Sequence, residues 1–460
     1  MLIYPPAHWG ETQRFCQPLG ILTLASMLKK EGIRVIVIDL LAECWNPKKV
    51  AMYISQGNFT HVGITILSGF RNIAYSIFQM VKKIDSNIIT LAGGPHVTLF
   101  GEKVLSECRA IDIAVAGEAE LLIADIIRNP IKKFYNAGYV TDIDNLPIPD
   151  RSFVRHNKYD RMSNLWFGDS ASIKWVRGCS WRKCRFCGRH DLTKMARWRS
   201  PEKIVEEIAI LQNEMNYKNL IVVDDSIRIN SKFVKKILRL KIKEGLDIPF
   251  WSMCRADHTD EEGMRLMNRA GATGLLIGLE SIVPRIIEIY NKTNKPRLWY
   301  KKLDQTFELA DKYQIIAIAC FILGGPTETE KELWTTINYC RTAKLDFIQP
   351  FPFIFSIGTE IWEEAIQKGH IQPNQLWTYT DRRYGLTPWT TEELFSLAVK
   401  AQNLVENPLL NPRRYIRLFR KLIKSKRFIF LGQNFIRLPL ILNEFRRKQT
   451  YEILPEDIHA

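Results

Sequence analysis

The stretch Arg177-Gly178-Cys179-Ser180-Trp181-Arg182-Lys183-Cys184-Arg185-Phe186-Cys187-Gly188 places three cysteines within nine residues. It directly follows a short apolar run, residues 173–176, that is typical of a strand. Three close thiolates on a loop can bind three irons of a cubane cluster, which leaves the fourth iron open. Neighbouring arginine and lysine side chains favour the thiolate because they lower the pKa of a thiol. The stretch therefore predicts a metal centre on Cys179, Cys184 and Cys187.

Zinc is the main alternative occupant of these thiols. A structural zinc site needs four ligands, and His190 is near enough in sequence to supply the fourth. Unrelated buried thiols are a third interpretation. The spacing favours an iron-sulfur cluster over zinc, and either metal over unrelated thiols.

The residues after the cysteines repeat a pattern of short apolar runs separated by helix-like segments. Together with the run before the cysteines, they predict six strands and a partial (β/α)6 barrel of the TIM type. The chemistry of such barrels lies at the carboxyl ends of the strands. The six runs are 173–176, 220–223, 250–254, 274–279, 315–323 and 347–355.

The first part of the chain shows the same rhythm, with apolar runs at 2–4, 35–38, 62–66, 88–92 and 111–115. These runs predict an α/β domain with a five-stranded parallel, Rossmann-like sheet. Such sheets bind ligands beyond the carboxyl ends of their strands. Those ends carry Pro5 and Pro6, Asp39, Thr65 with Ser68, the turn Gly93-Gly94-Pro95-His96, and Gly117-Glu118.

A segment rich in Asp, Asn and Pro, residues 142–150, separates the two series of strands, and its prolines disfavour a regular ladder. We therefore divide the chain into a Rossmann-like domain at 1–140, a linker at 141–170, a barrel at 171–370 and a helical, basic C-terminal region at 371–460.

Composition narrows the protein class. The chain has 460 residues and is 46% hydrophobic, which suits domains with sizeable cores. Nine cysteines form an odd count for a secreted disulfide framework, so we expect a reducing cytoplasm. No window of about 18 uninterrupted apolar residues predicts a transmembrane helix.

The formal charge of +16 is concentrated near the end, where residues 413–448 hold a single acidic residue, Glu444. A solvated helical face is the plain interpretation of this basic region. An acidic peptide, a phosphate-bearing intermediate, RNA or peripheral contact with an anionic membrane are the alternatives. No RNA-binding signature accompanies the region, and we expect no DNA partner.

With these motifs in this order, the chain resembles the radical SAM superfamily and, within it, the enzymes that carry an N-terminal cobalamin-binding domain. The resemblance covers about residues 1–370. The family motif has three and then two residues between its cysteines, with an aromatic residue before the last. Phe186 matches, but four residues separate Cys179 from Cys184 here. The resemblance implies a 4Fe-4S cluster on the three cysteines, with S-adenosyl-L-methionine (SAM) on the open iron.

Two strand ends resemble family elements that bind SAM. Asp224 and Asp225, in Asp224-Asp225-Ser226, stand where the family often has a Gly-Gly-Glu segment that binds the amino group of SAM. The alternative is a solvated acid at a strand end. Arg255, in Cys254-Arg255-Ala256-Asp257, resembles the family's Arg-Ala-Asp element and suits a carboxylate partner. Its alternative is a structural ion pair.

Two later strand ends add to the resemblance. Glu280 and Ser281, in Gly278-Leu279-Glu280-Ser281, resemble the segment whose glutamate contacts the ribose or amino-acid part of SAM. Gly324 and Gly325 begin Gly324-Gly325-Pro326-Thr327-Glu328-Thr329, which resembles the family's Gly-x-Pro-Gly-Glu-Thr element, although Thr327 replaces its second glycine.

In the first domain the resemblance implies bound cobalamin, with Gly93, Gly94, His96, Gly117 and Glu118 as contacts. Glycines at strand ends let a ligand approach the backbone closely. The Asp-x-His-x-x-Gly motif that supplies an axial histidine is missing. A structural hydrogen bond is favoured for His96 over ligation of cobalt. A Rossmann-like domain that binds no corrin is the open alternative.

The function implied is a cobalamin-dependent radical SAM enzyme that reductively cleaves SAM, with C-methylation of an unactivated carbon in a natural product, lipid or peptide. An electron donor such as flavodoxin or ferredoxin is the implied partner. A radical SAM cyclase, epimerase or oxidoreductase without methyl transfer is the alternative of the same class. A non-catalytic corrin- or zinc-binding interaction protein is the alternative of another class.

Overall fold

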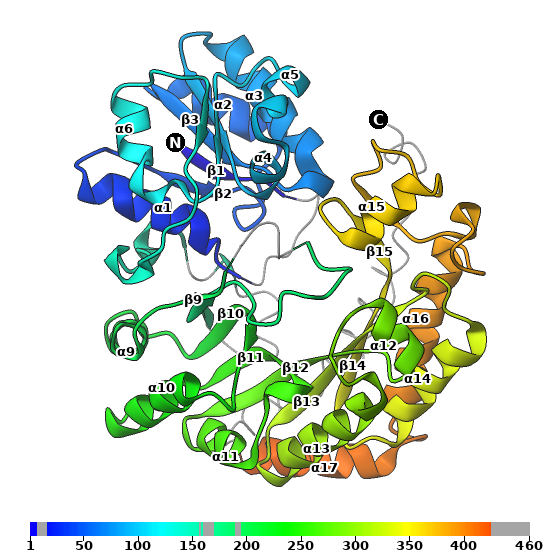
Figure 1. Ribbon diagram of the computed structural model, residues 1–460. Coiled ribbons are helices and arrows are strands. Elements are labelled where there is room, and N and C mark those ends of the chain that lie inside the picture. The colour runs from blue at the N-terminus through cyan, green and yellow to red at the C-terminus, as the bar shows by residue number, and fades with distance from the viewer. Residues whose placement is uncertain (7–15, 156–157, 160–169, 189–194, 425–460) are drawn as a thin grey trace.

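Two α/β lobes form the bulk of the protein, and Figure 1 shows the N-terminal lobe above the larger second lobe. The structure is a computed structural model, and it describes residues 1–6, 16–155, 158–159, 170–188 and 195–424.

The first lobe is built on a six-stranded parallel sheet with the order β2-β1-β3-β4-β5-β6. The Rossmann-like parallel sheet predicted from the sequence is therefore present. Its strands are β1 (Leu2–Tyr4), β2 (Val37–Asp39), β3 (His61–Thr65), β4 (Ile89–Gly93), β5 (Ile113–Ala116) and β6 (Phe134–Asn136).

The expected number of five strands is wrong, because β6 was not predicted. This strand has three residues, none of them fully buried, and it forms an edge beside β5. It lacks the apolar run that marks the other strands, since only one of its faces contacts the core.

Helices cover both faces of this sheet. Two core clusters result, one between the sheet and the helices α1 and α6, the other between the sheet and α2 and α3. The helices are α1 (Leu19–Lys30), α2 (Pro47–Gln56), α3 (Arg71–Ile84), α4 (Pro95–Phe100), α5 (Val104–Glu107) and α6 (Ile123–Arg128).

The second lobe is built on a six-stranded parallel sheet with the order β14-β13-β12-β11-β10-β7, so the six strands expected here are present. We refer to this sheet below as the barrel. Alternating buried positions on these strands pack against surrounding helices in one large core. The strands are β7 (Ser170–Ile173), β10 (Asn219–Ile227), β11 (Phe250–Arg255), β12 (Ala272–Glu280), β13 (Ile316–Leu323) and β14 (Phe347–Pro352). The helices are α9 (Pro201–Ala209), α10 (Lys232–Lys243), α11 (Glu261–Arg269), α12 (Pro284–Ile289), α13 (Trp299–Lys312) and α14 (Glu330–Thr342).

The first strand of the barrel ends earlier than expected. The apolar run 173–176 is divided between the end of β7 and a separate short strand, β8 (Val176–Arg177), which pairs with β9 (Arg197–Trp198) in an antiparallel ribbon. The chain leaves the barrel because the backbone N–H groups of Trp175 and Val176 donate to the Asp224 carboxylate, at 2.8 and 3.1 Å. The cysteine loop begins at the end of this ribbon.

After β14 the described part of the chain forms a two-stranded antiparallel ribbon and three α-helices, of which β16, α16 and α17 fall in the predicted C-terminal region 371–460. Helix α17 lies below the barrel in Figure 1, where its Leu418 packs with Trp251 and Ile316 from the strands. The elements are β15 (Ile354–Ser356), α15 (Glu360–Gln367), β16 (Trp377–Tyr379), α16 (Thr391–Glu406) and α17 (Pro412–Lys424). Residues 425–460, which carry the rest of the basic region, lie outside the described residues.

The proposed linker contacts both lobes. Its Asp150 accepts a hydrogen bond from Lys29 of α1 at 2.7 Å, and the buried Arg151 donates to Glu207 of α9 at 2.5 Å. Among the described residues, none of the helices is both long enough and apolar enough to cross a membrane.

Candidate functional site

A large cavity opens between the two lobes. Its volume is about 1800 Å³, well above the roughly 300–1,000 Å³ that pockets for drug-sized molecules occupy. Its lining runs from the strand ends of the first sheet, through the linker, to Trp175, Val176, Arg177, Val223 and Met253 of the second lobe. The cavity therefore has the size for a large cofactor and reaches the base of the cysteine loop.

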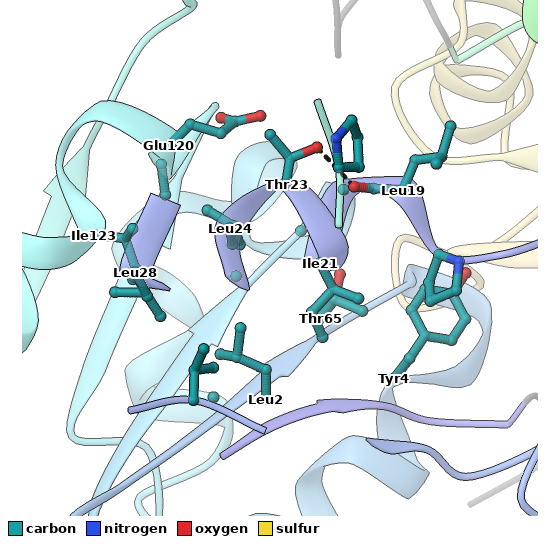
Figure 2. A pocket seen from close by; sticks show the side chains of 18 of the residues that line it. Leu2, Tyr4, Leu19, Ile21, Thr23, Leu24, Leu28, Thr65, Glu120 and Ile123 are labelled. Atoms are coloured by element: carbon teal, nitrogen blue, oxygen red, sulfur yellow. Dashed lines mark hydrogen bonds between the residues drawn. The ribbon is translucent and has the colours of Figure 1, made fainter. Parts of the chain in front are cut away.

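Figure 2 shows the part of this cavity inside the first lobe. Ile21 and Leu24 of α1 lie on one side, and Leu2 and Tyr4 of β1 lie on the other, with Thr65 between them. This part of the wall is mainly apolar, and it continues along α1 to Leu28. The carboxyl ends of parallel strands, where Thr65 lies, are the usual ligand site of this fold. The lining also extends beneath α1 to the amino ends of the strands, at Met1 and His61.

The glycine turns predicted for cobalamin line the cavity, including Gly93, Gly94, Gly117 and the following Glu118. The backbone conformation of the turns themselves requires glycine at two of these positions. A Cβ on Gly94, whose φ is +93°, would lie 2.4 Å from the Thr65 hydroxyl, and a Cβ on Gly117, whose φ is +82°, would lie 2.4 Å from the Gly138 carbonyl. Their lack of side chains therefore allows the turns to close, whatever they bind.

His96 does not line the cavity. It is fully buried, and its ring nitrogens contact the Tyr75 hydroxyl at 2.9 Å and the Ser68 hydroxyl at 3.2 Å. The Tyr75 hydroxyl also donates to Glu107 at 2.6 Å. These contacts match the structural role that the sequence favoured for His96 over cobalt ligation.

Glu118 joins the two lobes. Its carboxylate accepts hydrogen bonds from Arg197 at 2.6 and 2.7 Å, and Arg177 lies 3.3 Å from it and 2.8 Å from Glu120. All four side chains are at least four-fifths buried. Because Arg177 and Arg197 belong to the ribbon β8–β9, this ion-pair network connects a wall of the cavity to the base of the cysteine loop.

The four-residue gap between Cys179 and Cys184 is accommodated by a tight turn. Arg182 has a φ of +49°, a conformation that non-glycine residues rarely adopt. The turn directs Arg182 and Lys183 to solvent, while Trp181 is half-buried and its indole Nε1 donates to the Asn291 carbonyl at 2.9 Å. The extra residue is therefore part of an ordered contact with the loop that follows α12.

Two cations lie beside Cys184. Arg255 Nη1 is 3.9 Å from its sulfur, and Lys292 is buried next to Arg255, which donates to the Lys292 carbonyl at 2.5 Å. Lys292 Nζ in turn lies 2.7 Å from Glu280 Oε1. Burial raises the pKa of the Cys184 thiol to about 11, although Lys292 and Arg255 act against this shift. Cys184, Arg255 and Glu280, three of the predicted site residues, are thus brought together.

The side chains around Cys184 are not arranged as the ligands of a metal ion. Within the described residues, no three His, Cys, Asp or Glu side chains are grouped closely enough to hold a metal ion. Cys179, Cys184 and Cys187 are all half-buried on one loop. His190, the proposed fourth ligand of a zinc site, lies outside the described residues.

Asp224 and Asp225 have different environments. Asp224 is fully buried, and its carboxylate accepts the two backbone hydrogen bonds that end β7; burial raises its pKa to about 7. Asp225 is half-exposed on the adjacent position of β10. Asp224 therefore holds the backbone in place, and Asp225 is the more accessible of the two carboxylates.

The remaining predicted residues support the barrel mouth. Ser281 is fully buried and contacts the Thr336 hydroxyl at 3.1 Å. The backbone N–H groups of Gly324 and Gly325 donate to the buried Glu328 carboxylate at 2.8 and 3.3 Å. Phe186 packs edge-on against the ring of Tyr290, with 5.1 Å between centroids.

Comparisons with known proteins match both lobes. The model of the radical SAM superfamily matches residues 173–340, and the model of the B12 binding domain matches residues 10–127. An uncharacterized methyltransferase of Pyrococcus horikoshii is 31% identical over 84% of this chain and 86% of its own length. This chain belongs to the radical SAM superfamily.

Two more distant similarities extend across both lobes of this radical SAM protein. The anaerobic magnesium-protoporphyrin IX monomethyl ester cyclase of Rubrivivax gelatinosus is 22% identical, over 97% of this chain and 80% of the cyclase. The radical SAM methyltransferase TsrM of Kitasatospora setae, solved with cobalamin and a 4Fe-4S cluster bound, has a TM-score of 0.65 at 15% identity and covers 80% of this chain and 78% of its own. At that identity the likeness shows the fold.

The prediction of a radical SAM enzyme with a cobalamin-binding domain in front is confirmed by these matches. Its cofactors are a 4Fe-4S cluster, SAM and cobalamin. The residues present fit this set: three half-buried thiols on one loop suit iron, cations stand beside one of them, and the cavity has room for a corrin.

Lys292 is the main site residue of the radical SAM protein that sequence reasoning missed. It lies in the loop Asn291–Pro296, which resembles no motif, so nothing in the sequence linked it to Glu280. In the sequence, Gly278 is a weak indication that Glu280 has a close neighbour. A Cβ there would lie 2.7 Å from the Glu280 carboxylate and 2.8 Å from Lys292 Nζ, so only glycine leaves room for the pair.

Proposed function

We propose that this radical SAM enzyme transfers a methyl group to an unactivated carbon of an apolar natural product, lipid or peptide. The observation that carries the proposal is the cavity that runs from the strand ends of the first sheet to Trp175 and Arg177, at the base of the cysteine loop. The residues that line this cavity, from Gly93 and Gly117 to Trp175, would hold the corrin, and cobalamin would supply the carrier of the methyl group.

The three cysteines would hold the cluster, and Lys292 and Arg255 would offset the negative charge that thiolates bring to a buried site. When bound, the cluster supplies the electron that splits SAM, and cobalamin supplies a carrier for the methyl group. Lys292 Nζ and the Arg255 guanidinium are also the cations available to the SAM carboxylate near Cys184.

Asp225, rather than its buried neighbour, is our candidate for binding the amino group of SAM. The Glu280 carboxylate, fixed by Lys292 at 2.7 Å, supplies an acceptor of defined direction for the ribose or amino group. The Gly324-Gly325 turn is held by Glu328. A Cβ on Gly324 would lie 2.6 Å from the Leu394 side chain and one on Gly325 1.9 Å from the Tyr290 hydroxyl, so these glycines are required by packing.

Exposed apolar side chains at the barrel mouth favour an apolar substrate. Met253 on β11 is 38% exposed, and Phe351 on β14 and Trp377 on β16 are each 47% exposed. A Cβ on Gly69 of the first lobe would lie 3.2 Å from the Trp377 ring. Trp377 therefore contacts the first lobe, and a substrate here would be shielded from water on that side.

Cyclisation without methyl transfer is the second candidate, because the similarity to the Rubrivivax cyclase spans 97% of this chain. The division at 1–140, 141–170, 171–370 and 371–460, and peripheral membrane contact through the basic C-terminal region, also remain proposals.

The test is anaerobic purification followed by reconstitution with iron and sulfide and measurement of bound corrin. SAM turnover is then assayed as 5'-deoxyadenosine and S-adenosylhomocysteine. The proposal expects stoichiometric corrin and both products. Corrin-free protein with full 5'-deoxyadenosine formation would overturn the methyl-transfer part alone.

Cys184→Ala is the decisive variant, with Cys108→Ala as its matched control, since Cys108 is a buried thiol of the first lobe. Cys184→Ala should lose the full iron content and the cleavage of SAM, and Cys108→Ala should keep both. A full cluster and cleavage in Cys184→Ala would contradict the assignment of the cluster to this loop.

A further inference from the structure

A row of paired residues crosses the inner face of the barrel. It consists of Arg255 on β11, Gly278 on β12, Cys320 on β13 and Gln349 on β14, paired in that order. The residues one position earlier on the same strands are Cys254, Ile277, Ala319 and Ile348, and all four belong to the core that the barrel shares with its surrounding helices. Because side chains alternate between the two faces of a sheet, the first row faces the inside of the barrel.

The half of this row on β11 and β12 is charged. Arg255 forms an ion pair with Asp257 at 2.8 Å, and the pair of Lys292 and Glu280 lies over Gly278, in the space that a Cβ would take there. These are the charges that face the site proposed for SAM. The half on β13 and β14 is neutral, and two strand spacings, about 10 Å, separate β12 from β14.

In the neutral half, Cys320 orients the amide of Gln349. The Cys320 thiol donates a hydrogen bond to Gln349 Oε1 at 3.5 Å. Burial raises the pKa of this thiol to about 12, so it keeps the proton that it donates. The Gln349 side chain is exposed, and its amide nitrogen donates to none of the residues that the structure describes. With its oxygen occupied, the amide therefore presents its N–H donors to the inside of the barrel.

The surroundings of this amide are apolar. Phe351, two residues further along β14, is 47% exposed, and Met253 on β11 is 38% exposed. The next row toward the base of the barrel consists of Met253, Leu276, Ile318 and Phe347, paired in that order. The large cavity between the lobes reaches this inner face at Val223 and Met253. A ligand that enters from the cavity would thus meet an apolar wall with one amide donor in it.

A neutral acceptor suits the Gln349 amide better than an anion does. Arg255 and Lys292, the cations nearest to the row, are already paired, and the proposed function assigns them to SAM. A carboxylate beside Gln349 would therefore be held in a half-enclosed site without a counterion, which is costly. The carbonyl oxygen of an amide or ester needs only a neutral donor.

We propose that Gln349 binds an uncharged carbonyl group of the substrate, an amide or an ester, whose apolar body lies against Met253 and Phe351. The inference rests on the proposed function and narrows its substrate to a molecule that carries such a carbonyl. Cys320 is a positioning residue, because it acts on the substrate through the Gln349 amide. A carbonyl held on β14 leaves the rest of the molecule to extend toward β12 and the SAM site.

Four variants test this site. Gln349→Glu replaces the donors by a carboxylate of the same shape, and Gln349→Leu removes the polar group. Cys320→Ala removes the hydrogen bond to the amide, and Cys320→Ser keeps a donor in its place. The matched control is Gln305→Glu, the same change at an exposed position of α13, on the outside of the barrel.

Binding is measured by calorimetry on the full chain, reconstituted with corrin and cluster and saturated with SAM, without a reductant. The cofactor sites are then filled and nothing turns over. The probes are octanamide, methyl octanoate, octanoate and octylamine, which combine similar apolar chains with different polar groups. Octanamide represents a peptide or N-acyl substrate, and methyl octanoate represents an ester lipid, so their relative affinities distinguish these two sources.

The unaltered protein and Gln305→Glu should bind at least one neutral carbonyl probe about tenfold more tightly than octanoate, a difference of about 1.4 kcal/mol. Gln349→Leu should lose this preference. Gln349→Glu should bind octylamine most tightly, because its carboxylate accepts hydrogen bonds and donates none. Cys320→Ala should weaken the neutral probe about threefold, and Cys320→Ser should restore the affinity.

Equal preferences in Gln349→Glu and the unaltered protein, or no binding of either neutral probe to the unaltered protein, would overturn the carbonyl site. A loss in Cys320→Ala that Cys320→Ser did not restore would overturn the positioning role of Cys320. The proposed function fails separately. If a reductant produced neither 5'-deoxyadenosine nor S-adenosylhomocysteine while the probes bound as expected, the methyl-transfer reaction would be wrong and the carbonyl site would stand.

Discussion

Lys292 Nζ lies 2.7 Å from Glu280 Oε1 at the mouth of the barrel, and the two side chains are only 7% and 13% exposed. Glu280 adopts a φ of +59° at the end of β12, a conformation that costs a non-glycine residue free energy and persists only where its surroundings enforce it. The ion pair, with Gly278 leaving room for it, supplies that constraint. The carboxylate is thus preorganised toward the Cys184 side of the mouth.

Lys292→Met should destabilise the fold by about 3–5 kcal/mol, because it leaves the Glu280 carboxylate buried without its counterion. The double variant Lys292→Met/Glu280→Gln should recover most of this loss. Urea unfolding gives the free energies, and equilibrium dialysis with SAM gives the affinities. Equal stability of Lys292→Met and the unaltered protein would show that the pair is solvated.

The contact between the lobes should depend on the ionisation of Glu118. Burial acts to raise the pKa of this carboxyl, but the hydrogen bonds from Arg197 and the charge of Arg177 outweigh burial and hold the pKa below its ordinary value. A lowered folded pKa stabilises the protein above the unfolded pKa, and this stabilisation is lost as the pH falls through the folded pKa.

Glu118→Gln should therefore be less stable than the unaltered protein at pH 7, and the difference should shrink below about pH 4. Unfolding curves between pH 3 and pH 8 measure it. The exposed pair Lys203 and Glu206 offers the control, Glu206→Gln, which should change stability by less than about 0.5 kcal/mol. If the loss of stability in Glu118→Gln did not vary with pH, the assigned role of the ionised Glu118 would be contradicted.

His96 should prove unnecessary for cobalt. Burial lowers the pKa of the imidazole, and the opposing effect of Glu107 does not compensate, so His96 is neutral near pH 7. His96→Asn should cost about 1–3 kcal/mol, because it leaves buried partners without their hydrogen bonds.

The absorption spectrum of bound aquacobalamin should be the same in His96→Asn and the unaltered protein. The stability that the neutral imidazole provides is present above the unfolded pKa and is lost as the pH falls through the lowered folded value, so the unaltered protein should weaken below about pH 6.5. A shifted corrin spectrum in the variant would make His96 an axial ligand after all.

The apolar runs predicted most of the fold because every strand with two buried faces carries one. They missed β6, whose three residues are only partly buried at an edge. They also ended the second barrel strand at Val223, whereas β10 continues to Ile227 with a register shift after Val222. Since side chains of a strand alternate between its faces, Asp224 is then turned into the core and Asp225 toward the opposite face. Sequence order alone did not distinguish the two acids.

Motif reasoning singled out Cys184, Arg255 and Glu280 because Arg255 and Glu280 end β11 and β12, and the cysteine loop follows β8. Lys292 was missed because it is brought there by an irregular loop, whose path depends on Trp181, Asn291 and Trp299 and not on any periodic pattern. The basic region was noticed from its charge, but charge does not show which side chains are buried. In α17, the side chains of Arg414 and Lys421 are buried, with exposed fractions of 3% and 1%.

Lys421 fixes α17 to the base of the barrel. Its Nζ lies 2.6 Å from Asp346 Oδ2, and both side chains are fully buried. The same carboxylate oxygen accepts the backbone N–H of Ala317 at 2.8 Å, at the start of β13. Helix α17 thus closes the barrel through this pair and through Leu418, and part of the basic charge is structural.

Lys421→Met should therefore cost about 3–5 kcal/mol by leaving the Asp346 carboxylate buried and unpaired. Arg420→Ala, which removes an exposed charge from the same helix, should stay within about 0.5 kcal/mol of the unaltered protein. Urea midpoints measure both, and the fluorescence of Trp251, which packs with Leu418, reports on the contact of α17. If both variants lost the same small amount of stability, α17 would be a solvated helix and its basic charge would be available to an anionic partner.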